Sequence, residues 1–588
     1  MGKILRKMNV LLDKKQKLAM AGLLVLMLIG AILEVGSIGI VVPVVSMVMD
    51  ENAIYNGGIV QTLYELLPVN SARQFTIVIM LSLIGMFVLK NIFLFIQQKF
   101  MLSFVYGNQF STSERLMKNY LRRDYEYYLN ADTAVVQRNI TSDVNNMYAL
   151  ILALLQLLSE AIVFTCLVGV LFVQDPVMTV LVTVVLLVVL FVIKVVLKPV
   201  MHRAGEDNQN FYSGLFKWIS QTVTGIKEVK IAGKEQYFVD AYVQCGKGYV
   251  NAVQKYSLYN SVPRLLIETV MIICMVGYML YLLLNGIGAE SMITTISAFA
   301  VAAMRLLPSA NRINNQLNTI AFSEPFFMGV SDNLQDEING ENTDMSFATE
   351  AQEKLPVKKA IELKDITYAY PNTEKLIFDH ADLMVPVGSS VGIVGTSGAG
   401  KSTVVDILLG LLKPRTGHIY ADGVDVMTNY RAWLKNIGYI PQMIFMLDGT
   451  IRENVAFGVH PDAMDEERIW EVLKEAQLDT FVRSLPDGLD TSIGERGIRL
   501  SGGQRQRIGI ARALYEDPEV LVLDEATSAL DNDTEAAIMD SINRLHGRKT
   551  LVIIAHRLQT IEKCDMIYRV ENGKATLEKN EGSKEYKG

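Results

Sequence analysis

Long apolar stretches in the first half of the sequence constrain the fold most strongly. A membrane-spanning helix needs about 20 mostly apolar residues, and six stretches have this character. They are Leu18–Met49, Thr76–Gln98, Leu150–Val173, Val177–Leu197, Leu265–Leu284 and a last one from Ile293 into the region of Arg312, which turns polar from Arg305. Core helices of a soluble protein are the alternative, but six such runs favour a polytopic α-helical membrane domain with six transmembrane helices.

Basic residues mark one side of the predicted membrane. Lys and Arg are frequent before the first span, between the second and third spans, and between the fourth and fifth, whereas the first opposite loop holds only Arg73. Cytoplasmic loops carry such an excess, so we expect a multi-pass protein of the cell inner (plasma) membrane with both termini cytoplasmic. A cleaved signal peptide is the alternative for the basic N-terminus, but the apolar run is too long and no small-residue cleavage site follows.

Length and composition set the domain organisation. A chain of 588 residues is too long for a single core. We expect a transmembrane domain over 1–330, a polar and acidic linker over 331–359 and a nucleotide-binding domain over 360–588. The net charge of −7 predicts no nucleic-acid partner, and the four widely spaced cysteines match neither a metal site nor a disulfide framework.

Two features are predicted in the polar segments of the membrane half. The long segments on the basic side are expected to continue the membrane helices into the cytoplasm. In the first outer loop, Ile59–Leu67 has its apolar residues on one helical face. This stretch is either a short amphipathic helix on the outer leaflet or a loop that packs on the spans.

A glycine-rich stretch in the second half matches the phosphate-binding pattern G-x-x-x-x-G-K-[ST]. Its residues are Gly395, Thr396, Ser397, Gly398, Ala399, Gly400, Lys401, Ser402 and Thr403. A strand is predicted before it at Ser390–Val394 and a helix after it at Val404–Leu412, the context that distinguishes this motif from a chance glycine-rich turn. Backbone N–H groups of such a loop cradle phosphates, Lys401 can reach the β- and γ-phosphates, and the Ser402 hydroxyl can hold Mg²⁺.

Further candidate residues follow predicted strands of the same half. Gln442 follows an apolar strand and suits a contact to Mg²⁺ and the attacking water. Asp524 and Glu525 end a buried strand: Asp524 suits Mg²⁺ coordination through water, and Glu525 suits the general base. His556 ends another strand and can contact the γ-phosphate, and Tyr370 can stack on adenine. Solvated carboxylates, a structural histidine and an ordinary strand tyrosine are the alternatives.

Three further motifs identify a family. Leu500–Gln504 resembles the signature motif of ATP-binding-cassette (ABC) proteins, Gly494–Gly497 the X-loop of the exporter subgroup, and Ser528–Asp531 the D-loop. The whole chain resembles an ABC exporter half-transporter, whose cassette is an α/β domain. The resemblance implies ATP hydrolysis with Mg²⁺, coupled to transport by alternating access. It also implies that the signature motif completes the ATP site of an opposite cassette, and hence a homodimer. The nucleotide contacts that it assigns in these motifs are Ser501, Gly502, Gly503, Gln504 and Asp531.

Cations inside the spans point to the cargo. Charge in hydrocarbon is costly, yet Lys90, Arg264 and Arg305 lie within or at the ends of predicted spans, toward their cytoplasmic halves. These residues suit binding of an anionic group in a water-filled cavity. Internal pairing is the alternative, and the available partners are Glu34, Glu160 and Glu268.

A second resemblance narrows the substrate. Val262–Glu268 and Arg305–Arg312 resemble segments of bacterial flippases for lipid-linked oligosaccharides of protein N-glycosylation, where basic cavity residues are associated with the polyprenyl pyrophosphate. The flippases have Arg at the position of Lys90. The positive charge is therefore kept in this chain, but the planar guanidinium that binds two phosphate oxygens at once is not. The resemblance implies a flippase that moves an anionic glycolipid within membrane lipid. An exporter of amphipathic drugs, lipids or peptides, and a cassette protein that uses ATP for signalling or assembly without transport, are the alternatives.

Overall fold

The computed structural model describes residues 2–39, 64–65, 71–174, 176–284, 289–335, 353–525, 536, 538–540, 542, 544–555 and 561–580. The chain divides into two compact units. The membrane unit comprises 1–123 and 131–346, and the nucleotide unit comprises 124–130 and 347–588. The predicted outer-loop segment Ile59–Leu67 lies outside the described residues except for Tyr64 and Glu65.

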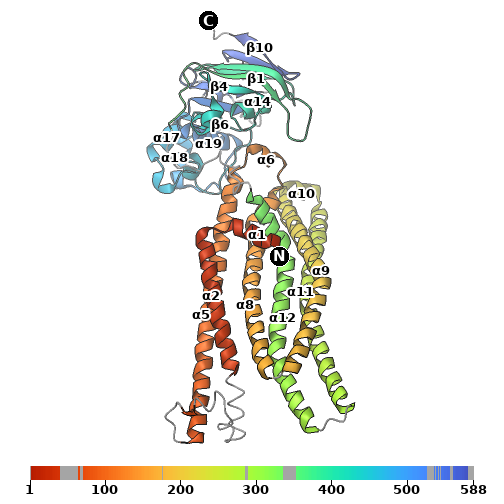
Figure 1. Ribbon diagram of the computed structural model, residues 1–588. Coiled ribbons are helices and arrows are strands. Elements are labelled where there is room, and N and C mark those ends of the chain that lie inside the picture. The colour runs from red at the N-terminus through yellow and green to blue at the C-terminus, as the bar shows by residue number, and fades with distance from the viewer. Residues whose placement is uncertain are drawn as a thin grey trace. The chain divides into compact units, whose positions relative to one another are not determined.

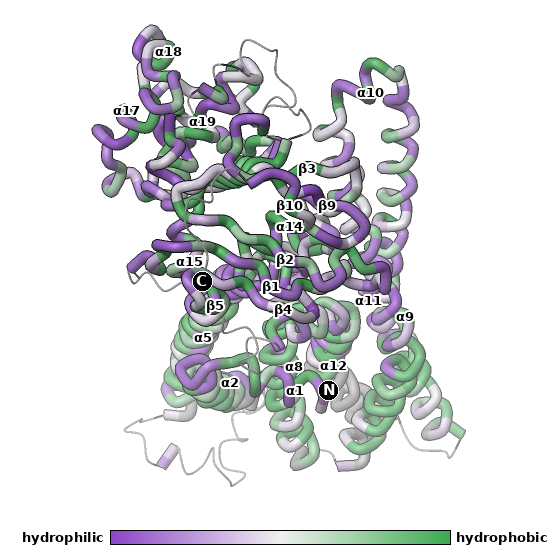
Figure 2. The backbone as a smooth tube through the Cα atoms, turned by 90° about the horizontal axis from the view of Figure 1, so that it is seen from above, coloured by the Kyte–Doolittle hydropathy of each residue, from purple (hydrophilic) through white to green (hydrophobic). Residues whose placement is uncertain are grey.

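The membrane unit is built from helices (Figure 1). They are α1 (Gly2–Leu11), α2 (Lys14–Gly39), α5 (Ala72–Arg122), α7 (Thr133–Arg138), the π-helical turn η2 (Asn139–Asp143), α8 (Val144–Gln174), α9 (Pro176–Thr224), α10 (Ile226–Ala232), α11 (Glu235–Leu284) and α12 (Ala289–Asn333). Within the described residues, five helices are long and apolar enough to span a membrane. They overlap the first five predicted spans, of which the first extends past the described residues at 40–49, and α12 overlaps the sixth. Figure 2 colours long stretches of α2, α5, α8 and α9 as hydrophobic.

Several of these helices are much longer than a bilayer requires. Helices α5, α9 and α11 have 51, 49 and 50 residues, which corresponds to about 75 Å at 1.5 Å per residue. The hydrocarbon core is only about 30 Å thick, so a large part of each helix lies in water. The predicted helical continuation of the spans is therefore confirmed.

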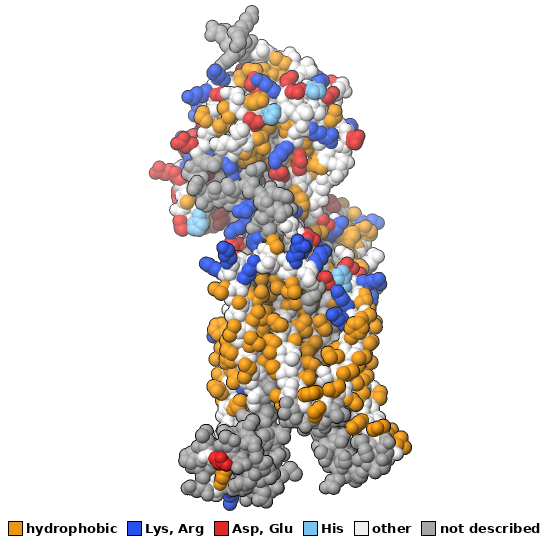
Figure 3. Space-filling model, viewed as in Figure 1, with side chains coloured by type: hydrophobic (Ala, Val, Ile, Leu, Met, Phe, Trp, Pro, Cys, Tyr) orange, Lys and Arg blue, Asp and Glu red, His pale blue; other side chains and the backbone are white. Residues whose placement is uncertain are grey.

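Apolar packing and close helix contacts hold the membrane unit together. Leu186 and Leu190 of α9, Ile267 of α11 and Leu306 of α12 are buried in one cluster. Helices α9 and α12 approach closely at Gly205, where an added Cβ would lie 2.0 Å from the backbone oxygen of Phe322. On the face shown in Figure 3, hydrophobic side chains cover the helices, and Lys and Arg gather at the end of this unit that holds α1 and α10 (compare Figure 1).

The nucleotide unit contains two sheets, and every strand of its central sheet except the edge strand β10 carries buried apolar residues. The central sheet has the order β10-β9-β3-β8-β7-β6, parallel except for β10. The strands are β3 (Ser390–Val394), β6 (Ile437–Ile440), β7 (Val520–Asp524), β8 (Thr550–Ile554), β9 (Met566–Glu571) and β10 (Lys574–Asn580). The second sheet is antiparallel, with the order β2-β1-β4-β5. Its strands are β1 (Ala360–Tyr368), β2 (Phe378–Pro386), β4 (Thr416–Ala421) and β5 (Val424–Asp425).

Short helices complete the nucleotide unit. They are α6 (Tyr125–Asn130), α14 (Lys401–Leu408), α15 (Tyr430–Leu434), α16 (Ile451–Val455), α17 (Glu466–Glu475), α18 (Asp479–Ser484) and α19 (Gly502–Tyr515). The α6 segment belongs to this unit through the ion pair of Asp124 with Lys413, at 3.1 Å, and through Tyr368, whose hydroxyl donates to Glu126 at 3.4 Å.

The strand predicted before the phosphate-binding pattern is confirmed, but the boundaries predicted for the following helix are wrong. Helix α14 runs over Lys401–Leu408 and not Val404–Leu412. It begins directly after Gly400, whose φ of 103° ends the loop, and it stops before Gly410, whose φ of 74° is left-handed. Glycine adopts both conformations without the steric cost that other residues meet, so these two glycines set the ends of the helix.

Candidate nucleotide-binding site

The phosphate-binding loop lies between β3 and α14, and its backbone leaves no room for larger residues. A Cβ on Gly395 would lie 2.4 Å from the backbone oxygen of Val570, and one on Gly400 would lie 2.9 Å from Ile377. Lys401 is 5% exposed, and its ammonium donates to the carbonyls of Gly395 and Thr396 at 3.1 Å each. The lysine is thus held across the loop, where phosphate oxygens could replace the two carbonyls as acceptors.

Two carboxylates stand at the end of β7, next to this loop. The Ser402 hydroxyl lies 3.5 Å from the Asp524 carboxylate. The side-chain amide of Gln442, just after β6, donates to the Glu525 carboxylate at 2.8 Å. Glu525 has a φ of 49°, a left-handed conformation that is uncommon for residues other than glycine. The fold therefore brings Ser402, Gln442, Asp524 and Glu525 together, as the sequence predicted.

Negative charge is concentrated at this point. Burial, followed by the neighbouring charge of Glu525, raises the pKa of Asp524. Asp406 of α14 is close enough to feel the charge of Asp524. Burial, and to a lesser extent this charge, raises the pKa of Asp406 to about 6. A cation would relieve this repulsion. Mg²⁺ typically uses one or two carboxylates together with phosphate oxygens rather than a full protein cage. The residues fit Mg²⁺ delivered with a nucleotide, and the described residues contain no cluster of three or more His, Cys, Asp or Glu that could hold a metal alone.

Tyr370 lies beside the phosphate loop. It follows β1 by two residues, and its hydroxyl is 2.9 Å from the hydroxyl of Thr403 in α14. Its ring meets that of Tyr368 edge-on, with centroids 5.4 Å apart. A hydrogen bond thus holds the Tyr370 ring next to the phosphate loop, and the adenine contact of this ring stays a prediction.

The signature residues start helix α19. The Ser501 hydroxyl accepts from the N–H of Gln504 at 3.2 Å, and the Gln504 side chain accepts from the N–H of Ser501 at 2.8 Å, which forms a capping box. Gly502 and Gly503 form the first turn. Helices α19 and α14 lie apart in both Figure 1 and Figure 2, and among the described residues no hydrogen bond joins Ser501 to the phosphate loop of its own chain.

Two predicted site residues cannot be placed. His556 and Asp531 lie outside the described residues. The prediction of both residues rests on their positions in the sequence: His556 follows β8 and Asp531 follows β7.

Arg512 is a positioning residue that the sequence prediction missed. It lies on α19 and donates to the carbonyls of Phe445 at 2.6 Å and Asn454 at 2.8 Å. Burial lowers the pKa of Arg512 to about 10. Phe445 is three residues after Gln442, so Arg512 links the signature helix to the segment that carries Gln442. The sequence signal that could have pointed to Arg512 is its place between two small apolar residues, Ala511 and Ala513, which the structure shows to be buried.

The predicted substrate cations are not gathered within one chain. Lys90 lies on α5 and Arg264 on α11, and these helices are apart in Figures 1 and 2. The Lys90 ammonium stacks over the Phe87 ring, 4.6 Å from its centroid. Arg264 pairs with Glu268 of the same helix at 2.9 Å. Arg305 is in α12, but its side chain lies outside those that the structure describes.

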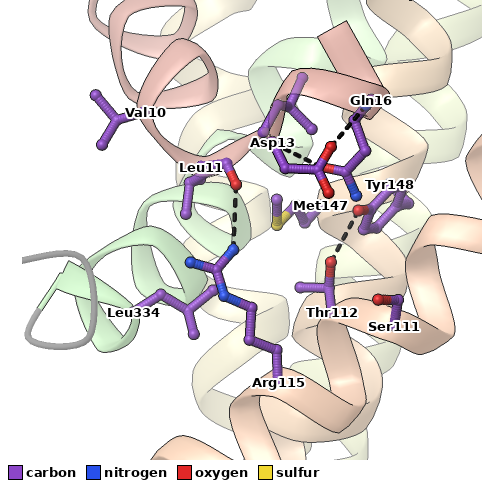
Figure 4. A pocket seen from close by; sticks show the side chains of 11 residues that line it. Val10, Leu11, Asp13, Gln16, Ser111, Thr112, Arg115, Met147, Tyr148 and Leu334 are labelled. Carbon is purple, nitrogen blue, oxygen red and sulfur yellow. Dashed lines mark hydrogen bonds between the residues drawn. The ribbon is translucent and has the colours of Figure 1, made fainter. Parts of the chain in front are cut away.

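A cavity near the start of the chain has a structural role. It measures about 380 Å³ and lies where α1 meets α2, beside α5 and α8 (Figure 4). The Arg115 guanidinium donates to the carbonyl of Leu11 at 3.1 Å, the last residue of α1. The hydroxyls of Thr112 and Tyr148 bond to each other at 2.8 Å. These contacts anchor α1 to the long helices and satisfy the groups involved.

Comparison with protein families agrees with this geometry. The family model of the ABC transporter transmembrane region matches residues 10–306, and the ABC transporter model matches residues 378–528. The chain belongs to the ABC transporters. It carries one transmembrane region and one cassette, so it is a multi-pass ABC exporter half-transporter that uses ATP with Mg²⁺ and couples ATP hydrolysis to transport.

Individual relatives match over most of the chain. The uncharacterised ABC transporter ATP-binding protein YfiC of Bacillus subtilis is 28% identical over 84% of this chain and 81% of its own length. The ATP-dependent lipid A-core flippase of Desulfotalea psychrophila is 29% identical over 78% of each chain. The structure of a bacterial Atm1-family ABC exporter with ATP bound has the same fold, with a TM-score of 0.76 over 97% of this chain and 96% of that one at 20% identity.

Proposed function

We propose that this exporter is a flippase that moves a polyprenyl-pyrophosphate-linked oligosaccharide from the cytoplasmic to the outer leaflet of the plasma membrane. The observation that carries the proposal is the Lys90 ammonium within the apolar part of α5. Its described neighbour is the Phe87 ring, and among the described residues no carboxylate pairs with it. An uncompensated charge at membrane depth marks a functional site, and pyrophosphate supplies the opposite charge.

Two further findings support a lipid cargo. The Desulfotalea psychrophila relative is named for flipping a lipid, lipid A-core. The sequence around Arg264 and Arg305 resembles that of flippases for lipid-linked oligosaccharides. Glu268 partly neutralises the charge of Arg264. We therefore assign binding of the anionic group chiefly to Lys90 and Arg305. Arg264 contributes when the cargo displaces Glu268 from it.

The charge distribution supports a proposal for the orientation of the membrane domain. The gathering of Lys and Arg at one end of the membrane unit (Figure 3) supports a cytoplasmic location for that end and hence for both termini. We propose the division into a transmembrane domain over 1–330, a linker over 331–359 and a cassette over 360–588.

We propose that the residues of the nucleotide site have the following roles. MgATP brings the phosphates and the cation to the site. Lys401 and the loop N–H groups bind the phosphates, and Ser402, Gln442 and Asp524 hold Mg²⁺. Glu525 takes the proton from the attacking water, and Gln442 orients the Glu525 carboxylate through their 2.8 Å hydrogen bond. His556 and Asp531 complete the site at the γ-phosphate and at the D-loop.

This arrangement calls for a second cassette, because among the described residues no hydrogen bond joins Ser501 to the phosphate loop of its own chain, and we propose that the second cassette belongs to another copy of this chain. The N-terminus of α19 carries partial positive charge that suits the γ-phosphate of a second chain. Two copies would form two equivalent ATP sites, each built from the phosphate loop of one chain and Ser501 of the other.

Mixed dimers test the shared site. Chains with Ser501→Arg keep an intact phosphate loop, and chains with Lys401→Ala keep an intact signature motif. A dimer of one of each therefore has one complete site if the sites are shared. We expect each variant alone to be inactive and the purified mixed dimer, isolated with two affinity tags, to recover ATPase activity. A mixed dimer that is as inactive as the single variants would show that each site is built within one chain.

Lys90→Met tests the cargo site. The substitution keeps side-chain length but removes the charge, so we expect flipping of the glycolipid to fall about ten- to a hundredfold, the range for loss of a charged hydrogen bond, and to fall more than basal ATPase. Arg305→Ala is expected to act in the same direction. Lys194→Met on α9 is the matched control, because Lys194 is exposed and can reach the membrane surface. Equal losses of flipping and ATPase in Lys90→Met would instead assign Lys90 to folding.

A further inference from the structure

A polar cavity lies within the membrane unit, between four of its helices. It has a volume of about 330 Å³ and is lined by residues of α2, α5, α8 and α12 (helices labelled in Figure 1). Its polar lining includes two carboxylates and several amides: Glu34, Gln97, Gln98, Gln156, Glu160 and Gln316. Of these residues, Glu34, Gln156 and Glu160 lie within predicted spans, where polar groups are costly and usually functional.

The two carboxylates differ in what they bind within the chain. Both Glu160 oxygens are engaged, one by the Arg312 guanidinium at 2.7 Å and the other by the Ser309 hydroxyl at 3.0 Å. The charges of Glu160 and Arg312 therefore cancel. Glu34 of α2 is half-buried, and none of the described side chains pairs with its carboxylate, so it remains an acceptor for a ligand.

The amides of the cavity also lack partners. Gln97 is 8% exposed, and its amide oxygen has no hydrogen-bond partner among the described residues. Gln156 and Gln316 are partly buried, and within the described part of the chain no side-chain hydrogen bond satisfies their amides. An amide that is kept out of water without a partner destabilises the protein, so Gln97 is expected to meet a ligand. Gln156 and Gln316 line the same cavity and have hydrogen-bonding groups to offer to that ligand.

The chemistry of the lining favours hydroxyl groups. Amides both donate and accept hydrogen bonds, and so do hydroxyls. A phosphate can only accept, and it would be repelled by Glu34. A lipophilic ammonium would pair with Glu34 and could donate to the amide oxygens, but it would leave the amide N–H donors unsatisfied, because it accepts no hydrogen bond. The volume is at the small end of the range for small-molecule sites, so the cavity fits a sugar unit and not a long glycan.

We propose that this cavity binds sugar hydroxyls of the cargo head group, with Gln156 and Gln316 as its principal hydrogen-bonding side chains and Glu34 as an acceptor. The inference rests on the proposed flippase function. It adds a second element of recognition: cations bind the pyrophosphate, and this cavity selects carriers that already hold a glycan.

Binding of two lipids separates the two elements. The wild-type chain and the variants Gln156→Met and Gln316→Met are placed in lipid nanodiscs, and their affinities for a glycan-bearing polyprenyl pyrophosphate and for the bare polyprenyl pyrophosphate are measured. Methionine keeps the volume but cannot replace the amide. We expect each variant to lose about three- to tenfold in affinity for the glycan-bearing lipid, with an unchanged affinity for the bare carrier. Gln254→Met on α11, at an exposed glutamine away from the cavity, is expected to bind both lipids as the wild type does.

The outcomes distinguish this inference from the proposed function. If the wild type binds the glycan-bearing lipid and both variants bind it equally well, the cavity does not recognise sugar and the inference is wrong, while the flippase proposal stands. If the wild type binds neither lipid, the flippase proposal and the inference both fail. Equal losses of affinity for both lipids would also overturn the inference about the cavity. The melting temperatures of the variants show whether such losses come from misfolding.

Discussion

The Glu525→Gln variant is expected to bind ATP as tightly as the wild type and to lose at least about a hundredfold in ATP hydrolysis, because general bases contribute 10²–10⁴-fold. Glutamine keeps the shape of the side chain and can still pair with Gln442, now amide to amide. It cannot take a proton from the attacking water. Hydrolysis is measured by phosphate release in liposomes, and binding by a fluorescent ATP analogue.

Glu571→Gln is the matched control for this variant. Glu571 is an exposed residue at the end of β9, so the same loss of charge there should leave hydrolysis at the wild-type level. Hydrolysis in Glu525→Gln within about threefold of wild type, far below the effect of a base, would remove Glu525 from that role. Loss of ATP binding would show that Glu525 contributes to the structure of the site instead.

The Lys401→Ala variant is expected to have the largest effect on nucleotide affinity. Removal of one partner from a buried, hydrogen-bonded charge pair costs about 2–5 kcal/mol, which is about a thirtyfold to several-thousandfold weaker binding. The buried ammonium is held by the carbonyls of Gly395 and Thr396 and would exchange them for phosphate oxygens. Calorimetry with MgATP and MgADP measures the loss, which should be larger for MgATP because Lys401 also reaches the γ-phosphate.

Lys474→Ala provides the corresponding control. Lys474 is an exposed residue in the last turn of α17, and its substitution should leave nucleotide affinity unchanged. An equal affinity of wild type and Lys401→Ala for MgATP would contradict the assigned role. A lowered melting temperature without nucleotide would indicate that the lysine mainly stabilises the loop.

Local sequence patterns predicted the elements that are set by nearby residues. Strand β3 and the phosphate loop follow from spacing within one short segment. The bounds predicted for the next helix were wrong, because the backbone conformations of Gly400 and Gly410 set the ends of α14. The spans follow from apolar length, and the continuation of α9 and α11 beyond the membrane follows from the long polar segments on the basic side of the predicted spans.

Contacts between distant residues could not be predicted in the same way. The hydrogen bond between Gln442 and Glu525 joins residues 83 positions apart, and its existence depends on β6 and β7 lying side by side. Arg512 reaches Phe445 because α19 packs behind that segment. Similarly, the pairing of Glu160 with Arg312 was not predicted. The sequence offered Glu160 as a partner for Lys90, Arg264 or Arg305, and Arg312 was not considered as a charge.

The most direct test of the account is glycolipid translocation in liposomes that contain only the purified protein. A polyprenyl-pyrophosphate-linked oligosaccharide is placed in both leaflets, and an external glycan-modifying enzyme reports the accessible fraction with and without ATP. Proteins whose cassettes face the outside use the added ATP to move glycolipid inward, so the account predicts an ATP-dependent loss of accessible glycan. This loss should not occur in liposomes with the Glu525→Gln variant. Intact ATPase activity with unchanged accessibility across several glycans would contradict the flippase function and favour an exporter of other amphipathic molecules.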